Sequence, residues 1–152
     1  PSISFSVQIA EVEVDRETGK VKVLKSVVVD ELGQPINPQL LAGQMEGGTI
    51  ASMGQAIFEE VLLDEKGRAL HANFLDYKMP TALDVPEQEV HHIISPSVYG
   101  PFGAKGGGEI STSTSLPAVV NAICAATGIR FTELPITPQK IIQGFKDKER
   151  SK

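Results

Sequence analysis

Apolar and polar residues alternate along the first fourteen positions of the chain. Residues 3–14 place an apolar side chain at about every second position, and residues 20–30 are rich in valine. Period-two alternation and β-branched side chains are typical of strands. The polar stretch from Asp15 to Lys20 predicts a turn between them. We therefore expect an N-terminal β-hairpin.

The next segment, residues 38–63, predicts a long helix with unusually many glycines. Asn37 is a favourable N-cap, and the proline that follows it suits the first helical position. Each of the four glycines costs about 0.8–1.0 kcal/mol relative to alanine. Gly47, Ala51 and Gly54 recur at helical spacing, so one face of the helix is nearly bare backbone. That face either packs closely on another element, which spacing alone favours, or contacts a ligand.

Five shorter elements are predicted in the second half of the chain. Ser115 is expected to cap a core helix, with Pro117 in its first turn and Cys124 as an inert thiol on its apolar side. The elements are strands at 69–77 and 89–94, the helix from 115 to 128, a short strand at 131–134 and a helix at 137–145.

This order of elements favours an α+β fold, namely a two-layer sandwich of a mixed β-sheet and helices. At 152 residues the chain has the size of one ordinary domain. We place the domain at residues 1–145 and expect the charged residues 146–152 to form a frayed tail. Because the sequence begins with proline, we expect a processed chain or a piece of a longer one.

Composition and charge exclude several classes of function. The net charge is −5, and lysine and arginine cluster only near the C-terminus, which argues against a nucleic acid as partner. No apolar run reaches the roughly 18 residues of a membrane span. A single cysteine excludes an internal disulfide and an iron–sulfur cluster held by this chain alone. A reducing compartment, the cytoplasm, is expected.

The three histidines do not predict a metal site. His91 and His92 are adjacent in a predicted strand, so their side chains point to opposite faces of the sheet. His71 stands alone in the sequence. We expect no metal ion to be bound by protein side chains of this chain.

A glycine-rich loop at residues 99–109 is the strongest candidate for a functional element. It holds five glycines and ends in Glu109, with Lys105 four residues earlier. Glycines let the backbone approach another group closely, at a cost in conformational entropy. Free N–H groups at the start of the next helix attract anions, although Lys105 is not placed as in a P-loop. Taken alone, this spacing favours a solvated or helix-capping role for Glu109.

Six motifs in unbroken order resemble the C-terminal part of the molybdenum-binding subunit of the xanthine dehydrogenase and aldehyde oxidase family. They are Ile-Asn-Pro at 36–38, Gly-Gln-Met-Glu-Gly-Gly at 43–48, Met-Gly-Gln-Ala at 53–56, Asp-Tyr-Lys-Met-Pro-Thr-Ala at 76–82, Gly-Pro-Phe-Gly-Ala-Lys-Gly-Gly-Gly-Glu at 100–109 and Thr-Glu-Leu-Pro at 132–135.

The resemblance implies that Glu109 is the catalytic base, which takes a proton from a hydroxyl group on molybdenum, and that Lys105 helps to position the loop. It implies a molybdenum–molybdopterin cofactor, with the cytosine dinucleotide form as one candidate. The implied cofactor-binding residues are Gly47, Gly48, Thr49, Ala51, Ser52, Lys105, Gly106, Gly107 and Gly108.

Two positions depart from the family pattern. Ala51-Ser52 stands where the family usually has Gln-Gly, so a side-chain amide expected near the cofactor is missing. Gly107 replaces a common valine, which loosens the loop and keeps Glu109 in register.

The resemblance implies a hydroxylase or dehydrogenase that oxidises a purine, an N-heterocycle or an aldehyde. Related alternatives are an aromatic thioester reductase and a carbon monoxide dehydrogenase, and a different class is a non-catalytic structural or assembly module. The family subunit is several times longer, so the isolated chain is expected to be inactive. Implied partners are the remaining molybdenum-binding segment, a subunit with 2Fe–2S clusters and a subunit with FAD, in a hetero-oligomer.

Overall fold

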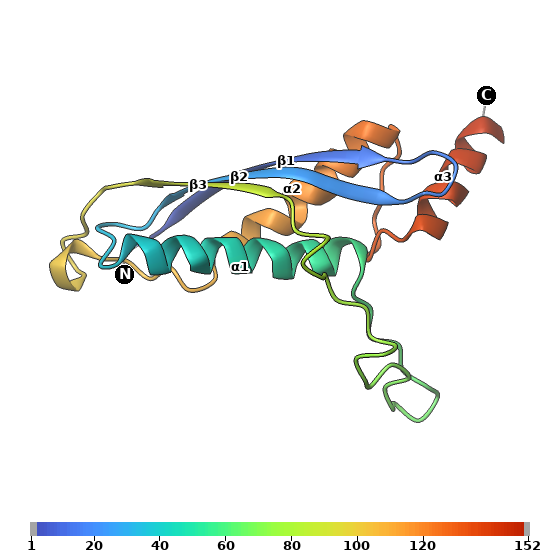
Figure 1. Cartoon of the computed structure of the whole chain (residues 1–152), viewed down its shortest axis with the longest axis horizontal. Coiled ribbons are helices and arrows are strands. Elements are labelled where there is room, and N and C mark those ends of the chain that lie inside the picture. Colours follow the sequence, from blue (N-terminus) through green and yellow to red (C-terminus); the bar gives the residue numbers. More distant parts are fainter. Residues whose placement is uncertain (1–2, 151–152) are drawn as a thin grey trace.

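A three-stranded sheet forms the centre of the computed structural model, which describes residues 3–150 (Figure 1). Strands β1 (Phe5–Val14) and β2 (Val21–Glu31) form an antiparallel hairpin. Strand β3 (Glu87–Ile93) runs parallel to β2 along its other edge. The predicted hairpin and the predicted mixed sheet are both confirmed.

Two helices, α1 (Pro38–Ile57) and α2 (Ile110–Thr127), pack against each other and against one side of the sheet (Figure 1). Helix α2 lies mainly under β1. This arrangement confirms the α+β two-layer fold. The buried core residues between the layers are Val21, Val23, Met53, Ala56, Ile57, Val119, Ile123, Ile136 and Ile141.

Helix α1 begins as predicted and ends earlier than predicted. The side chain of Asn37 caps it by accepting a hydrogen bond from the first turn. The helix ends at Ile57 rather than near residue 63, because the chain folds back over Gly54. A Cβ at Gly54 would clash with the Glu59 carboxylate and lie 2.9 Å from Pro80.

Residues 58–86 form an arm that leaves the body of the molecule and returns at β3 (Figure 1). The predicted strand at 69–77 is wrong. Asn73 accepts hydrogen bonds from the backbone N–H groups of Leu75 and Asp76 and so makes a turn. Phe74 and Leu75 are 89% and 81% exposed, so no core holds this segment in an extended sheet.

Helix α2 begins five residues before the predicted cap. Ser115 lies inside the helix, where its hydroxyl oxygen is 2.7 Å from the Ser111 carbonyl and 2.6 Å from Gln8 Oε1, two acceptors for its one proton. The start was misplaced because proline is common in a first turn, whereas Pro117 lies well inside the helix. Ser113, whose carbonyl loses its helical partner, is exposed to solvent.

The C-terminal segment also differs from prediction in two places. Residues 131–134 are not a strand, although Phe131 packs on the core. Helix α3 (Pro138–Arg150) continues past residue 145, where the predicted helix ended. Residues 146–150 thus extend this helix, and the domain boundary at 145 stays a prediction.

The first half of strand β1 turns its polar residues toward the helices and its apolar residues outward, whereas further along the strand Ala10, Val12 and Val14 pack on the core. Phe5, Val7 and Ile9 are 63–67% exposed, whereas Ser6 and Gln8 lie between sheet and helices. An amphipathic strand usually buries its apolar face. The alternation is therefore confirmed: in residues 5–9 the apolar side faces outward, and in residues 10–14 it faces the core.

The side chain of Gln8 holds this orientation. Its Nε2 donates to Ser26 Oγ at 2.7 Å and to Thr49 Oγ1 at 3.4 Å, and its Oε1 accepts from Ser115 Oγ at 2.6 Å and Thr114 Oγ1 at 3.1 Å. These partners lie on β2, α1 and α2. One amide thus joins four elements.

A buried carboxyl lies on the same inner face of the sheet. Asp30 is fully buried, and its carboxyl oxygens make no hydrogen bond among the described residues. Burial raises the pKa of Asp30, while the Ser6 hydroxyl and the charge of His92, its neighbour on β3, oppose the rise. The inner face is therefore polar at this end.

We predict that Gln8→Leu lowers the free energy of unfolding by about 1–3 kcal/mol, because it leaves buried hydroxyl groups without their amide partner. Urea unfolding followed by circular dichroism measures the change. Gln55→Leu is the control, since Gln55 is exposed on α1. Equal stability of the two variants would contradict the role given to Gln8.

Candidate functional site

The glycine-rich loop is tied to the chain that follows β2. The backbone N–H of Lys105 donates to the Leu32 carbonyl at 3.0 Å, and the N–H of Gln34 donates to the Gly103 carbonyl at 2.8 Å. Gly33 has a φ of +74°, and a Cβ there would clash with the loop backbone. The loop is therefore a fixed part of the fold and not a linker.

Lys105 anchors the loop through an ion pair. Its Nζ lies 2.6 Å from Glu31 Oε2 and also donates to the Ile3 carbonyl at 2.8 Å. The two charged side chains are only 12% and 13% exposed. The hydrogen bond from Lys105 holds the pKa of Glu31 below its usual range, and the hydrogen bond from the N–H of Gly33 adds a smaller effect in the same direction. This placement agrees with a positioning role for Lys105.

Helix α1 supports the loop from the other side. Gln44 Nε2 donates to the Gly108 carbonyl at 2.7 Å. A Cβ at Gly107 would lie 2.8 Å from Leu41 and 3.1 Å from Leu32, so a valine there would require these side chains to move. In contrast, no atom lies within 4 Å of a Cβ built at Gly106 or Gly108. One side of the loop is packed and the other is open.

Glu109 ends the loop and directly precedes α2. Its side chain is exposed and makes no capping hydrogen bond, so the helix-capping alternative does not apply. Its carbonyl accepts hydrogen bonds from the hydroxyl of Thr112 at 2.6 Å and from the N–H of Thr112 at 3.2 Å. The carboxylate is thus held on a fixed backbone, and its oxygens have no hydrogen-bond partner among residues 3–150.

A row of free backbone N–H groups lies beside this carboxylate. Within the described part of the chain, residues 106–109 donate no backbone hydrogen bond, and neither do the N–H groups of Ile110 and Ser111 at the start of α2. Successive free amides at a helix N-terminus attract anions. The sequence predicted free N–H groups at residues 111–115, close to Glu109, and the earlier helix start places them directly after Glu109.

The glycines of α1 have two different uses. A Cβ at Gly48 would clash with the hydroxyl of Ser111, so Gly48 lets α1 and α2 approach closely. Gly43 and Gly47 have no atom within 4 Å of a built Cβ, and Ala51 one turn later is exposed. Close packing explains Gly48, whereas Gly43, Gly47 and Ala51 form an open stripe along the helix.

The other two predicted residues on α1 point inward. Thr49 is buried and bonds to Gln8 and Ser115. Ser52 is buried, and its hydroxyl donates to the Thr112 carbonyl at 2.9 Å. Both side chains hold α2 in place. Neither side chain is exposed, so each can influence a ligand site only by fixing the position of α2.

An open groove lies where the loop meets the start of α1. Its lining residues come from the end of β2, from α1 and from the loop; they are Leu32, Gln34, Pro35, Ile36, Asn37, Leu40, Leu41, Gln44, Ala104, Lys105, Gly107 and Gly108. The groove brings together segments that are about 70 residues apart in sequence. Gln44 and Glu31 support the site and were given no role in the sequence analysis. Gln44 lies inside a family motif, whereas no sequence signal marks Glu31.

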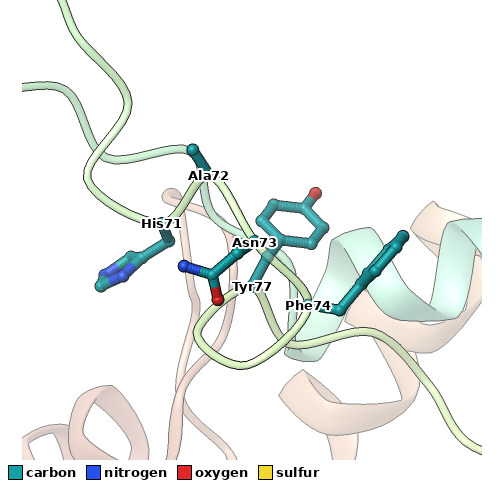
Figure 2. Close-up of a pocket in the computed structure, with 5 residues that line it drawn as sticks. All are labelled: His71, Ala72, Asn73, Phe74 and Tyr77. Atoms are coloured by element: carbon teal, nitrogen blue, oxygen red, sulfur yellow. The ribbon is translucent and has the colours of Figure 1, made fainter.

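A second hollow lies on the arm, away from these residues. His71, Ala72, Asn73, Phe74 and Tyr77 line it, and Figure 2 shows the side chains of His71 and Phe74 pointing away from each other. All five come from one short segment, and none is a predicted site residue. This hollow is a feature of the arm alone.

No group of three or more histidine, cysteine, aspartate or glutamate side chains in residues 3–150 could hold a metal ion. None of the helices in this range has the length and apolar character needed to cross a membrane.

Comparison with known proteins identifies the family. The model of the molybdopterin cofactor-binding domain matches residues 1–86, more than half of the chain. The chain belongs to this family. The predicted relationship to the molybdenum-binding subunits of molybdenum hydroxylases is thereby confirmed.

Three similar proteins illustrate the relationship. The nicotine 6-hydroxylase large subunit of Paenarthrobacter nicotinovorans is 39% identical over 89% of the chain and 17% of its own length. The carbon monoxide dehydrogenase large chain of Hydrogenophaga pseudoflava is 33% identical over 94% of the chain and 18% of its own length. The crystal structure of quinoline 2-oxidoreductase from Pseudomonas putida 86 matches with a TM-score of 0.84 and 34% identity, over 90% of this chain and 18% of that one. The chain therefore spans less than a fifth of each relative.

We predict opposite stability changes for two neighbouring glycines. Gly47→Ala raises the free energy of unfolding by about 0.8–1.0 kcal/mol, because alanine is the better helix former and its Cβ meets open space. Gly48→Ala lowers it, because its Cβ clashes with Ser111. Urea unfolding of both variants measures the changes. If both variants were more stable than wild type, or both less stable, the different roles given to Gly47 and Gly48 would be contradicted.

We predict that Lys105→Met lowers the melting temperature at pH 7, because Glu31 loses its partner. A lowered pKa means that the ion pair stabilises the fold above the ordinary glutamate value of about 4.3 and that this stabilisation is lost as pH falls through the folded-state value. The difference from wild type should shrink in that range. Melting curves from pH 3 to pH 7 measure it, with Lys22→Met, at an exposed lysine, as control. A difference independent of pH would show that packing and not charge is involved.

Proposed function

We propose that the chain is the part of a molybdenum hydroxylase that carries the catalytic base, Glu109. The supporting observation is the row of free amides at residues 106–109, held in place by packing on one side and ending at an exposed carboxylate. A solvated acid at the end of an ordinary linker would not need this support.

The residues present fit a molybdopterin cofactor. Its phosphate suits the free amides of the loop and of the α2 N-terminus. The open stripe of α1 at Gly47 and Ala51 offers backbone surface and no side-chain amide. In this proposal Gly47, Ala51, Gly106 and Gly108 contact the cofactor. The cytosine dinucleotide form remains one candidate.

The remaining predicted residues do not contact the cofactor in this proposal and instead hold the cofactor-binding surface in place. Gly48, Thr49 and Ser52 hold α2 against α1, while Gly107 packs the loop on α1. Lys105 ties the loop to Glu31. These contacts determine where the loop amides and the Glu109 backbone lie.

The bound cofactor supplies the two-electron oxidation chemistry that side chains lack. Glu109 acts as general base, and its carboxylate oxygens accept the proton that the reaction releases. A carboxylate is a stronger base where water is excluded. Glu109 is exposed in this chain, so the walls that exclude water come from other parts of the subunit. We therefore expect the isolated chain to be inactive.

The substrate class and the partners rest on the relatives. Relatives named for nicotine and quinoline support an N-heterocycle, with a purine or an aldehyde as further candidates. Carbon monoxide dehydrogenase is a second candidate function, since its large chain is 33% identical. We expect partner subunits with iron–sulfur clusters and FAD in a cytoplasmic complex, because this chain supplies neither group.

A non-catalytic assembly module is the alternative from another class. Ala51 in place of the usual glutamine favours it. Metal and pterin analysis of the complex purified from its native host separates the two functions. Molybdenum and pterin in the complex support the hydroxylase, whereas a complex without them supports the assembly module.

We predict that Glu109→Gln, in the native complex with its partner chains, retains molybdenum and pterin and lowers turnover about 10²–10⁴-fold, as the loss of a general base does. Steady-state turnover together with metal content measures this. Glu65→Gln is the control, at an exposed acid on the arm. Near-normal turnover of Glu109→Gln would overturn its assignment as the base.

A further inference from the structure

The face of the sheet opposite the helices carries an apolar patch. It consists of Ile3, Phe5, Val7 and Ile9, each 63–67% exposed, and of Ile93 on β3, 56% exposed. Strand pairing places Phe5 in line with Ile93, with Glu31 of β2 between them, and it places Val7 and Ile9 opposite Val29 and Val27. We call these seven apolar residues the outer patch. Figure 1 shows α1 and α2 on the other side of the sheet.

The outward direction of the patch is a fixed property of the fold. A strand that slipped by one residue would exchange its two faces. The hydrogen bonds of Gln8 to Ser26, Thr49 and Ser115 prevent such a slip, because they require the polar face of β1 to meet the helices. The chain therefore cannot bury the patch by itself.

The patch has clear borders. Further along the outer face of β1, the exposed residues are Glu11 and Glu13. On β3, Glu87 and Glu89 pair with Lys25 of β2. The apolar surface is thus confined to the first half of β1 and to Val27, Val29 and Ile93, and it is interrupted on β3 by His91, which lies in line with Val29. An apolar patch with a charged rim is typical of an interface.

The length of the related subunits indicates which protein surface covers the outer patch. In quinoline 2-oxidoreductase, the matching fold, at a TM-score of 0.84, makes up 18% of one continuous chain. The matching segment makes up a similar share of the nicotine 6-hydroxylase large subunit, 17%, and of the carbon monoxide dehydrogenase large chain, 18%. In each of them the same sheet lies within a subunit more than five times larger. Such a subunit can cover an apolar sheet face without a second copy.

We infer that the outer patch is the surface on which the remaining part of the molybdenum-binding subunit docks. The inference rests on the proposed function, because it takes this chain to be one part of such a subunit. The partner is a protein surface rich in aliphatic side chains, which packs on Phe5, Val7 and Ile9 and stops at Glu11. The patch thereby joins the fixed loop and Glu109 to the walls that complete the site.

The test places a photoreactive benzoylphenylalanine at Phe5 in the native complex. This substitution keeps an aromatic ring at an exposed position. After irradiation, mass spectrometry identifies the cross-linked peptides. The expected products contain sequence of the molybdenum-binding subunit from outside residues 1–152, on the same or on a separate polypeptide. The same probe at Glu13 is the control and should give at least about tenfold less of this product.

A double variant tests whether apolar packing holds the contact. Val7→Thr with Ile9→Thr keeps β-branched residues and removes apolar surface, so the strand is retained. It should lower the cross-link yield from position 5 several-fold, and circular dichroism should show an unchanged fold. Glu11→Thr with Glu13→Thr is the matched control and should leave the yield unchanged.

Three outcomes would overturn the inference. They are cross-links only between two copies of residues 1–152, cross-links only to an iron–sulfur or flavin subunit, and no cross-link from position 5. None of them depends on the cofactor or on turnover. A complex with molybdenum and a base at Glu109 but without the expected cross-link would reject the docking surface alone. A cross-link in a complex without molybdenum would reject the proposed chemistry alone.

Discussion

The hydrogen bonds of the Gln8 side chain are the interaction on which the structure depends most. This amide contacts Ser26 on β2, Thr49 on α1 and Ser115 on α2. It sets which face of β1 meets the helices, and it holds α1 and α2 at their close crossing. Because α2 begins at the end of the glycine-rich loop, the same contacts set the position of Glu109. At this end of the sheet, polar hydrogen bonds hold the strand against the helices, in addition to the apolar core elsewhere between them.

The crossing of α1 and α2 gives the glycines of α1 their separate roles. Gly48 is required because Ser111 occupies the space of a side chain, whereas Gly47 faces open space one residue earlier. A glycine that no packing requires costs helix stability. Its presence at Gly47 is explained if something outside the chain must approach the backbone, which agrees with the proposed cofactor surface.

The structure also explains why the chain is only part of a site. The loop has a fixed side, made by Lys105 with Glu31 and by Gln44, and an open side that ends at an exposed carboxylate. The sheet likewise has a covered side and an apolar open side. Both open surfaces fit a chain that spans less than a fifth of its relatives.

Local patterns were enough to predict the hairpin, the start of α1 at Asn37, strand β3, the apolar stripe of α2 and the two-layer fold. They were also enough for the family, since its motifs are contiguous in sequence. Local rules failed where distant residues decide. The arm at 69–77 has strand-like composition but no sheet to join, and Ser115 was read as a cap although Gln8 holds it inside α2.

The sequence by itself determined which residues form the loop, that it ends in a carboxylate and which family it belongs to, because these properties depend on neighbours along the chain. Only the tertiary structure decided which glycines are packed and which are open, that Lys105 pairs with Glu31, and that residues 5–9 of β1 turn their apolar side outward. Each of these depends on groups that are 60 or more residues apart in sequence. The physical reason is that a side chain's role is set by what it contacts, and those contacts form only when the sheet and both helices are assembled.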